Sequence, residues 1–384
     1  MLPFNAKTVF YKTKIKILKG TAMFLPFPKP TLFNGPGSSL DLCEAIAQMG
    51  TRRVLIVTDA MLVKIGLIDP IKARLTDLGV EFTIYDGVQP DPTVDQIEAG
   101  LELLRQNDCE AILAVGGGSP IDAAKVIGAR ATNDKPVQKM EGLFRVFRAT
   151  LPLYAIPTTA GTGSEVTIAA VVSDPERQMK FAIIDPKLVP TMAALDANLM
   201  TGLPPNITAA TGMDALTHAV DAYVSVNAVP DTDRHALAAT RLIMKNLRIV
   251  MEDGQNLEAR EHMSMASFYA ALAFTRAGVG YVHAISHNFG AYYHTPHGLA
   301  NAIVMPYVLD FSRPACTARL ADLAEASGLK HADDSDAALA RKFIDHIRSL
   351  NARFGIPEKL ETLKADDIPG IARAALKEAH GTYA

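Results

Sequence analysis

The chain has 384 residues, of which 49% are hydrophobic and 21% charged, and 38 Lys and Arg against 41 Asp and Glu leave a net charge of −3. At about 150 residues per domain, this length predicts roughly two or three domains with a large core. The balanced charge argues against sequence-independent binding of nucleic acid. No run approaches the ~20 apolar residues that span a bilayer.

The cysteines and the N-terminus indicate a reducing compartment. Three widely separated cysteines without a CxxC spacing exclude a disulfide framework and a thiolate zinc site. The first residues carry several lysines, but no apolar run follows that could serve as a secretion signal. We therefore expect a cytoplasmic protein whose residues 1–23 form an extension with little predictable structure.

Strand-like and helix-like segments alternate in the first half of the chain. Short apolar runs rich in β-branched residues predict strands at 54–57, 82–85, 111–115 and 153–156. Helical spacing between them predicts helices over 61–78 and 94–106. This alternation is typical of βαβ crossovers that build a buried parallel sheet. Segments 167–172 and 179–184 flank a polar turn and predict a β-hairpin.

After Leu203-Pro204-Pro205 the pattern changes to long Ala-, Leu- and Met-rich stretches with helical periodicity. We therefore predict an α/β domain with a Rossmann-like parallel sheet over residues 1–203. An all-α domain is expected to follow over residues 204–384. The chain shows no internal repeat and no low-complexity segment.

A glycine-rich loop lies between a predicted strand and a predicted helix at 121–129. Gly116, Gly117 and Gly118 allow close approach of a phosphate to backbone N–H groups, and Ser119 and Pro120 suit the N-cap and first turn of the helix. The loop matches neither the GxGxxG fingerprint nor a Walker A loop. By itself it is equally compatible with a strand-to-helix turn that binds nothing.

Two further features favour a nucleotide. Asp59 follows the strand at 54–57, at the sheet edge where open α/β folds bind ligands, and could accept from both ribose hydroxyls and repel a 2′-phosphate. Asp59 could also simply cap the next helix. The hydroxyl-rich loop 157–164 follows another strand. We predict NAD rather than NADP.

The histidines are clustered. All ten follow residue 217, and four lie in the window 283–297. Asp214 and His218 are four residues apart, as are His283 and His287, which places each pair on one helix face. His297 can join them only if the chain turns, for which Gly290 and Pro296 offer places. Three imidazoles with one carboxylate suit zinc, iron, nickel or manganese, so we predict a metal site.

At these motifs the sequence resembles the iron-dependent (group III) alcohol dehydrogenases, and most closely their lactaldehyde reductase/1,2-propanediol dehydrogenase-type members. The matching stretches are 116–125, 157–167, 210–219 and 283–300, and the resemblance extends from about Pro28 to the C-terminus. It implies a dehydroquinate synthase-like architecture and a homodimer or larger homo-oligomer. Family members usually continue past the position of Ala384 with a Pro-Arg motif and a terminal helix, which implies a shortened chain here.

The resemblance assigns roles to individual residues. It implies that Asp214, His218, His283 and His297 hold one divalent metal, most often Fe²⁺, with Zn²⁺ or Ni²⁺ also accommodated, and that His287 relays a proton. The ion would act as a Lewis acid on an alcohol whose hydride passes to the nicotinamide. The implied NAD-binding residues comprise Asp59, Asp91, Gly116, Gly117, Gly118, Ser119, Thr158, Thr159, Thr162, Ser164 and Lys180.

Two residues concern the substrate, and two alternatives stay open. Phe274 matches an aromatic residue near the family's substrate pocket. Ala169 stands where the lactaldehyde branch has Asn, so we expect a small primary alcohol or its aldehyde rather than a strict 1,2-diol. Asp91 stands where close relatives often have Asn, which concerns its contact on the adenosine side of the cofactor. The alternatives are a zinc polyol dehydrogenase similar to glycerol dehydrogenase, and a non-catalytic relative that binds metal or nucleotide.

Overall fold

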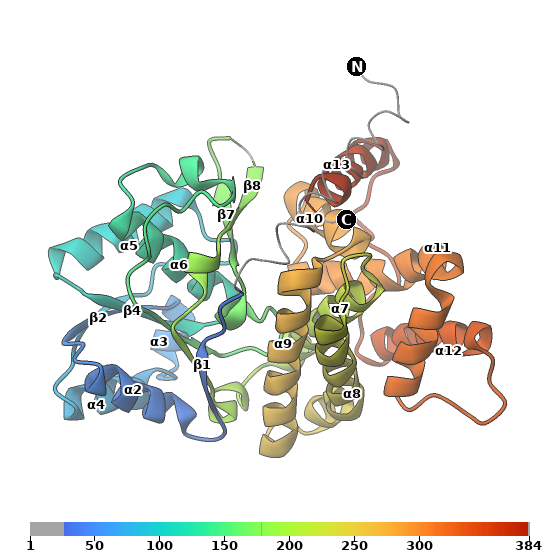
Figure 1. Cartoon of the computed structure of the whole chain (residues 1–384), viewed down its shortest axis with the longest axis horizontal. Coiled ribbons are helices and arrows are strands. Elements are labelled where there is room, and N and C mark those ends of the chain that lie inside the picture. The colour runs from blue at the N-terminus through green and yellow to red at the C-terminus, as the bar shows by residue number, and fades with distance from the viewer. Residues whose placement is uncertain (1–26, 178, 383–384) are drawn as a thin grey trace. The chain divides into compact units, whose positions relative to one another are not determined.

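A computed structural model describes residues 27–177 and 179–382, which form two compact units. One comprises Pro28–Pro204 and Glu252–Phe268, and the other includes Pro205–Met251 and the chain from Tyr269 onward. Within the described chain, every strand precedes residue 204, so the predicted fold class is confirmed (Figure 1). The expectation for residues 1–23 lies outside the described residues, and the domain limits 1–203 and 204–384 stay a prediction.

The first unit is built on a six-stranded parallel sheet, ordered β1-β9-β6-β4-β2-β3. Four of its strands coincide with the predicted runs, whereas β1 and β9 carry no clear sequence signal. The strands are β1 (Thr31–Asn34), β2 (Arg53–Val57), β3 (Glu81–Tyr85), β4 (Ala111–Gly116), β6 (Leu153–Pro157) and β9 (Met192–Leu195).

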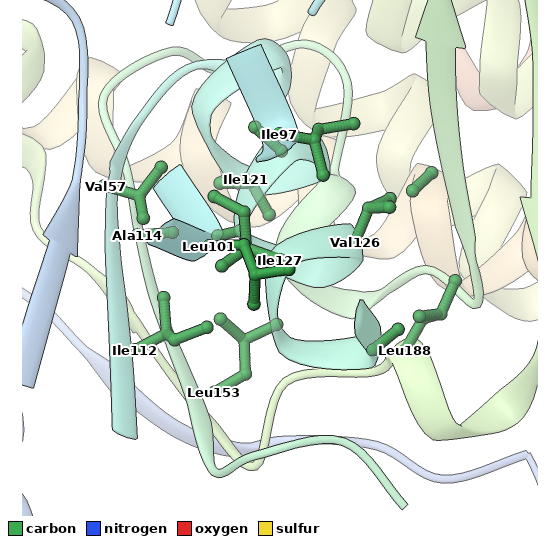
Figure 2. Close-up of a cluster of buried hydrophobic side chains, with 14 of the residues drawn as sticks. Val57, Ile97, Leu101, Ile112, Ala114, Ile121, Val126, Ile127, Leu153 and Leu188 are labelled. Carbon is green, nitrogen blue, oxygen red and sulfur yellow. The ribbon is translucent and has the colours of Figure 1, made fainter. Parts of the chain in front are cut away.

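Alternate side chains of the central strands β2, β4 and β6 enter different cores, as expected for a sheet covered on both faces. Ile112 and Ala114 of β4 pack among residues of α5 (Val94–Gln106) and α6 (Gly118–Thr132) (Figure 2). Leu113 of the same strand packs in a second core, with residues of α2 (Ser38–Gln48) and α4 (Asp69–Asp77). The burial of β4 fixes where the glycine-rich loop leaves the sheet.

Two predicted helices differ from the structure. The helix expected over 61–78 is divided into α3 (Ala60–Lys64) and α4, because Gly66 takes a left-handed φ of 72° and Pro70 starts a new helix. Helix α6 begins at Gly118, with Gly117 as its N-cap, so the expected cap at Ser119 is wrong. Pro120 is tolerated because the first N–H groups of a helix have no intrahelical partner.

A second, three-stranded sheet of β5 (Gly142–Leu143), β7 (Ala169–Asp174) and β8 (Met179–Ile184) contains the predicted hairpin. Strands β7 and β8 pair antiparallel from Ala169↔Ile184 to Asp174↔Met179. The short helices of this unit are η1 (Val137–Met140), η2 (Ser164–Val166), η3 (Pro186–Leu188) and η4 (Ala197–Met200).

The rest of the chain is helical. Helix α10 packs against α11 and α13, and α11 also packs against α7 and α12. No described helix is both long and apolar enough to cross a membrane. The helices are α7 (Pro205–Val224), α8 (Pro230–Glu252), α9 (Leu257–Ala277), α10 (Tyr281–Tyr293), α11 (His297–Ala326), α12 (Asp336–Arg353), η5 (Ala365–Asp367) and α13 (Ile368–Thr382) (Figure 1).

Candidate metal centre and cofactor loops

The structure brings together four side chains that the sequence predicts as metal ligands. Asp214 and His218 lie one turn apart on α7, His283 lies on α10, and His297 is the first residue of α11. One ligand atom from each lies within 4.8 Å of the others. Asp214, His218 and His283 are buried, whereas His297 is half-buried. Three helices thus converge on one compact group of three imidazoles and a carboxylate.

A sharp turn between α10 and α11 places His297 in this group. Helix α10 ends at Tyr293, His294 adopts a left-handed φ of 54°, and Pro296 is the N-cap of α11. The expected reversal therefore occurs at Pro296, while Gly290 stays inside α10. At Gly298 an added Cβ would lie 2.4 Å from the carbonyl oxygen of Ala210, so only glycine permits this approach of α11 to α7.

Asp221 orients one of the four side chains, that of His283, through a hydrogen bond. Its Oδ2 accepts a hydrogen bond from His283 Nδ1 at 2.7 Å and from the backbone N–H of Gly280 at 2.8 Å. Burial raises the pKa of Asp221 to about 7, and burial together with the neighbouring histidines holds the pKa of His283 well below its ordinary value. With Nδ1 engaged, Nε2 of His283 is the nitrogen left for a metal.

Asp221 was not predicted, although it lies seven residues after Asp214 and therefore two turns on, on the same face of α7. That spacing was the available signal. Gly280 has to be glycine here, because an added Cβ would lie 2.9 Å from Asp221 Oδ1.

The carboxylate of Asp214 is stabilised in its charged form. Burial alone would raise its pKa, but His218, His297, His283 and an amide hydrogen bond from Asn301 outweigh this effect and lower it. Asn301 Nδ2 donates to Asp214 Oδ1 at 2.7 Å. A buried carboxylate and three imidazoles are a suitable ligand set for a divalent transition metal, so these residues fit the ion that the sequence predicts.

His287 lies beside the cluster with a partner of its own. Its ring stacks on that of His297 at 5.2 Å between centroids, and its Nδ1 lies 2.6 Å from Oε1 of Glu378 on α13. Glu378 escaped the sequence analysis because it lies 91 residues away. Phe274, a predicted substrate-pocket residue, stacks on His218 with ring centroids 4.3 Å apart and therefore lies beside the cluster.

In the first unit, two loops lie together at the carboxyl ends of adjacent strands β4 and β6. Gly116 has a φ of 155°, and its carbonyl accepts a hydrogen bond from the N–H of Thr158 at 3.0 Å. An added Cβ at Gly118 would lie 2.8 Å from Thr162 Cγ2. The glycines therefore let the second loop pack on the first, at the edge where open α/β sheets bind ligands.

The remaining predicted cofactor residues surround these loops. Asp59 follows β2 and caps α3, accepting from the N–H of Leu62 at 3.0 Å. Lys180 on β8 forms an ion pair with Asp91 at 2.6 Å, and Ser119 Oγ accepts from the N–H of Asp91 at 3.3 Å. Asp91 adopts a left-handed φ of 60°, which Asp tolerates better than most residues.

A buried polar network supports the second loop. Lys125 on α6 is fully buried, and its ammonium donates to Thr167 Oγ1 at 2.9 Å and to the carbonyls of Thr167 and Ala169 at 3.0 and 2.7 Å. Asp122 accepts from the hydroxyl of Ser164. Burial lowers the pKa of Lys125 to about 8. Ala169, a predicted substrate residue, thus starts β7 and contributes its carbonyl to this network.

Comparison with known proteins gives a consistent result. A family model described as iron-containing alcohol dehydrogenase matches residues 29–197, and one for the C-terminal part of the Fe-containing alcohol dehydrogenase family matches 208–384. The chain is 38% identical to NAD-dependent methanol dehydrogenase of Bacillus methanolicus over 93% of this chain and 94% of that protein. It is 36% identical to lactaldehyde reductase of Escherichia coli over 91% of this chain and 92% of that protein. A crystal structure of 1,3-propanediol oxidoreductase superimposes with a TM-score of 0.90 at 40% sequence identity, and the match covers 93% of this chain and 94% of that chain.

Proposed function

We infer the activity of this chain from one premise: it belongs to the iron-containing alcohol dehydrogenase family. It is an NAD-dependent oxidoreductase of alcohols and aldehydes. We propose further that its substrate is a small primary alcohol or the corresponding aldehyde. The metal-dependent activity is carried by the group of Asp214, His218, His283 and His297, with His283 Nε2 left for a metal by the bond to Asp221. The proposed substrate class rests on Ala169, whose methyl group cannot hydrogen-bond a second hydroxyl.

The metal-binding unit would work through its own side chains in the following way. Asp214, His218, His283 and His297 hold one divalent ion, which when bound polarises the substrate oxygen as a Lewis acid. Asp221 fixes the ring of His283. His287, held at Nδ1 by Glu378, accepts the proton that the alcohol releases and passes it outward. Phe274 supplies an apolar wall beside His218.

The α/β unit would bind NAD through its two loops and the residues around them. Backbone N–H groups of Gly117, Gly118 and Ser119 at the start of α6 suit the diphosphate, because a helix N-terminus carries partial positive charge. The carboxylate of Asp59 suits the adenosine ribose hydroxyls. The rest of the proposed NAD-binding set comprises Asp91, Gly116, Thr158, Thr159, Thr162, Ser164 and Lys180.

An alcohol panel tests the proposed activity. Metal-loaded protein with NAD and 1-propanol, 1-butanol, 1,2-propanediol or glycerol should raise the absorbance at 340 nm, and we expect the fastest rise with a simple primary alcohol. A preference for glycerol would favour the polyol dehydrogenase alternative. Metal-loaded protein that binds NAD but oxidises no alcohol and reduces no aldehyde would favour the non-catalytic alternative.

Oligomeric state and location extend the same proposal. We propose a homodimer or larger homo-oligomer in the cytoplasm. The free, buried thiols of Cys43 and Cys109 are compatible with a reducing compartment. Light scattering after gel filtration would measure the mass of the assembly, and a single-chain mass of 41.2 kDa would contradict the proposed oligomer.

A further inference from the structure

A fifth polar side chain reaches into the metal-ligand cluster. Asn301 lies on α11 one turn after His297 and is fully buried. Its amide nitrogen lies 2.7 Å from Asp214 Oδ1, 3.1 Å from His297 Nε2 and 3.3 Å from His283 Nε2. We propose that Asn301 is a positioning residue of the metal centre, which holds the Asp214 carboxylate in place for the ion. This inference rests on the proposed ligand set.

The distances place the amide nitrogen within hydrogen-bond reach of three of the four proposed ligand side chains. Ligand atoms about 2.0–2.2 Å from a shared ion lie roughly 3 to 3.5 Å from one another. Asn301 Nδ2 has this separation from His297 and His283, and is closer to the carboxylate. A residue that only packs α11 against α7 would not need its polar end among three ligand atoms.

The chemistry of the three neighbours fixes the orientation of the amide. Asp214 Oδ1 is an acceptor, and His283 Nε2 carries a lone pair because Nδ1 donates to Asp221. An amide nitrogen satisfies these acceptors, whereas the carbonyl oxygen of a turned amide would face them with another lone pair. Among the residues that the structure describes, Asn301 Oδ1 has no hydrogen-bond partner.

The consequence concerns Asp214. The two amide N–H groups can serve the carboxylate and one imidazole together. With the imidazole lone pairs given to an ion, Asp214 Oδ1 would be the acceptor left for the amide, which would hold the carboxylate in one rotamer. Partners of this kind typically contribute 10- to 100-fold to metal affinity.

A matched pair of variants tests the role. Asn301→Ala removes the amide from the cluster. Asn351→Ala removes a similar buried amide that donates to the carbonyl of Ala302 at 2.7 Å, with an Oδ1 that also lacks a partner in the described chain. Zn²⁺ affinity is measured by competition with a chromophoric chelator, and the visible bands of Co²⁺-loaded protein report on ligand geometry. We expect about 10- to 100-fold weaker Zn²⁺ binding and shifted Co²⁺ bands in Asn301→Ala only.

Asn301→Asp keeps the size of the side chain and serves where the alanine variant fails to fold. It sets a second carboxylate against Asp214, so the rise in Tm on adding Zn²⁺ should exceed that of the unmodified protein. Wild-type affinity, Co²⁺ bands and Zn²⁺-dependent rise in Tm in the folded Asn301 variants would overturn the inference. His283→Ala distinguishes a failure of the proposed ligand set from a failure of the proposed role of Asn301. If His283→Ala retains the metal, the ligand set is contradicted. If His283→Ala loses the metal but the Asn301 variants bind it normally, only the role of Asn301 is contradicted.

Discussion

Asp221 and His283 form a buried carboxylate–imidazole pair, with 2.7 Å between Oδ2 and Nδ1 and only 3% and 2% of their side chains exposed. The same carboxylate binds the N–H of Gly280, where α10 begins. One side chain of α7 therefore fixes both the start of α10 and the ring orientation of a proposed ligand on it.

The first prediction follows from this pair. Asp221→Asn should weaken Zn²⁺ binding about 10- to 100-fold, because it replaces the carboxylate partner of His283 Nδ1 by an amide, which orients the ring less strongly. A chelator competition titration measures the affinity. Asp322→Asn is the matched control, since Asp322 accepts from the hydroxyl of Tyr223 and touches no proposed ligand. Equal affinity in both variants would contradict the role of Asp221.

The second prediction separates ligands from neighbours among the histidines. His283→Ala and His297→Ala should each abolish activity and lower the metal content, because each removes one of four donors. His287→Ala should keep the metal and change the rate and its pH dependence. Exposed His294, which ends α10, should tolerate alanine. Elemental analysis of the purified variants measures occupancy, and full occupancy in His283→Ala and His297→Ala would refute the ligand assignment.

Much of this architecture follows from the sequence, and what does not has a physical reason. Strands β2, β3, β4 and β6 are predicted because each is a short apolar run between helical segments. By contrast, β1 and β9 have only four residues each and pair across about 160 positions, so tertiary context decides their pairing.

The candidate site, too, could be predicted only in part from the sequence. Spacing indicates a metal site, and the resemblance selects His283 over His287 as a ligand. The side chains that hydrogen-bond these histidines could not be predicted from the sequence, because how the helices pack decides which carboxylate or amide faces which histidine. Asp221, Asn301 and Glu378 each meet a histidine on another helix.

The third prediction concerns the cofactor. Asp59 should favour NAD over NADP by about 100-fold or more in kcat/KM, because its charge would face the 2′-phosphate. Asp59→Gly should reduce this preference, and replacing a cap by glycine costs only a few tenths of a kcal/mol. Asp59→Asn keeps the cap of α3 and removes the charge, so it isolates the electrostatic part. Equal kcat/KM with both cofactors in the unmodified protein would refute the prediction.

The fourth prediction concerns Ala169, whose methyl group cannot hydrogen-bond a second hydroxyl of the substrate. The protein should oxidise 1-butanol at least as efficiently as 1,2-propanediol. Ala169→Asn should shift kcat/KM toward the diol, since a site that hydrogen-bonds a hydroxyl discriminates for it. Ala169→Val adds bulk without a polar group and is the control. A strong preference of the unmodified protein for 1,2-propanediol would contradict this role.

The last prediction concerns stability and pH. Burial raises the pKa of Glu165, which lies on η2 and interacts electrostatically with Lys125, from 4.5 to about 7. The folded protein therefore binds more protons than the unfolded chain between these values, so the contribution of protonated Glu165 is present below about pH 4.5 and is lost as the pH rises through 7. Glu165→Gln has no group that titrates there, so it should not lose this stability as the pH rises. The free energy of unfolding of the variant minus that of the unmodified protein should therefore be about 2 to 3 kcal/mol larger at pH 8 than at pH 5. Urea titrations at the two pH values measure the difference, with Glu81→Gln, an exposed position on β3, as a control whose difference should stay constant. A constant difference for Glu165→Gln as well would show that Glu165 is ionised in the folded protein throughout this range.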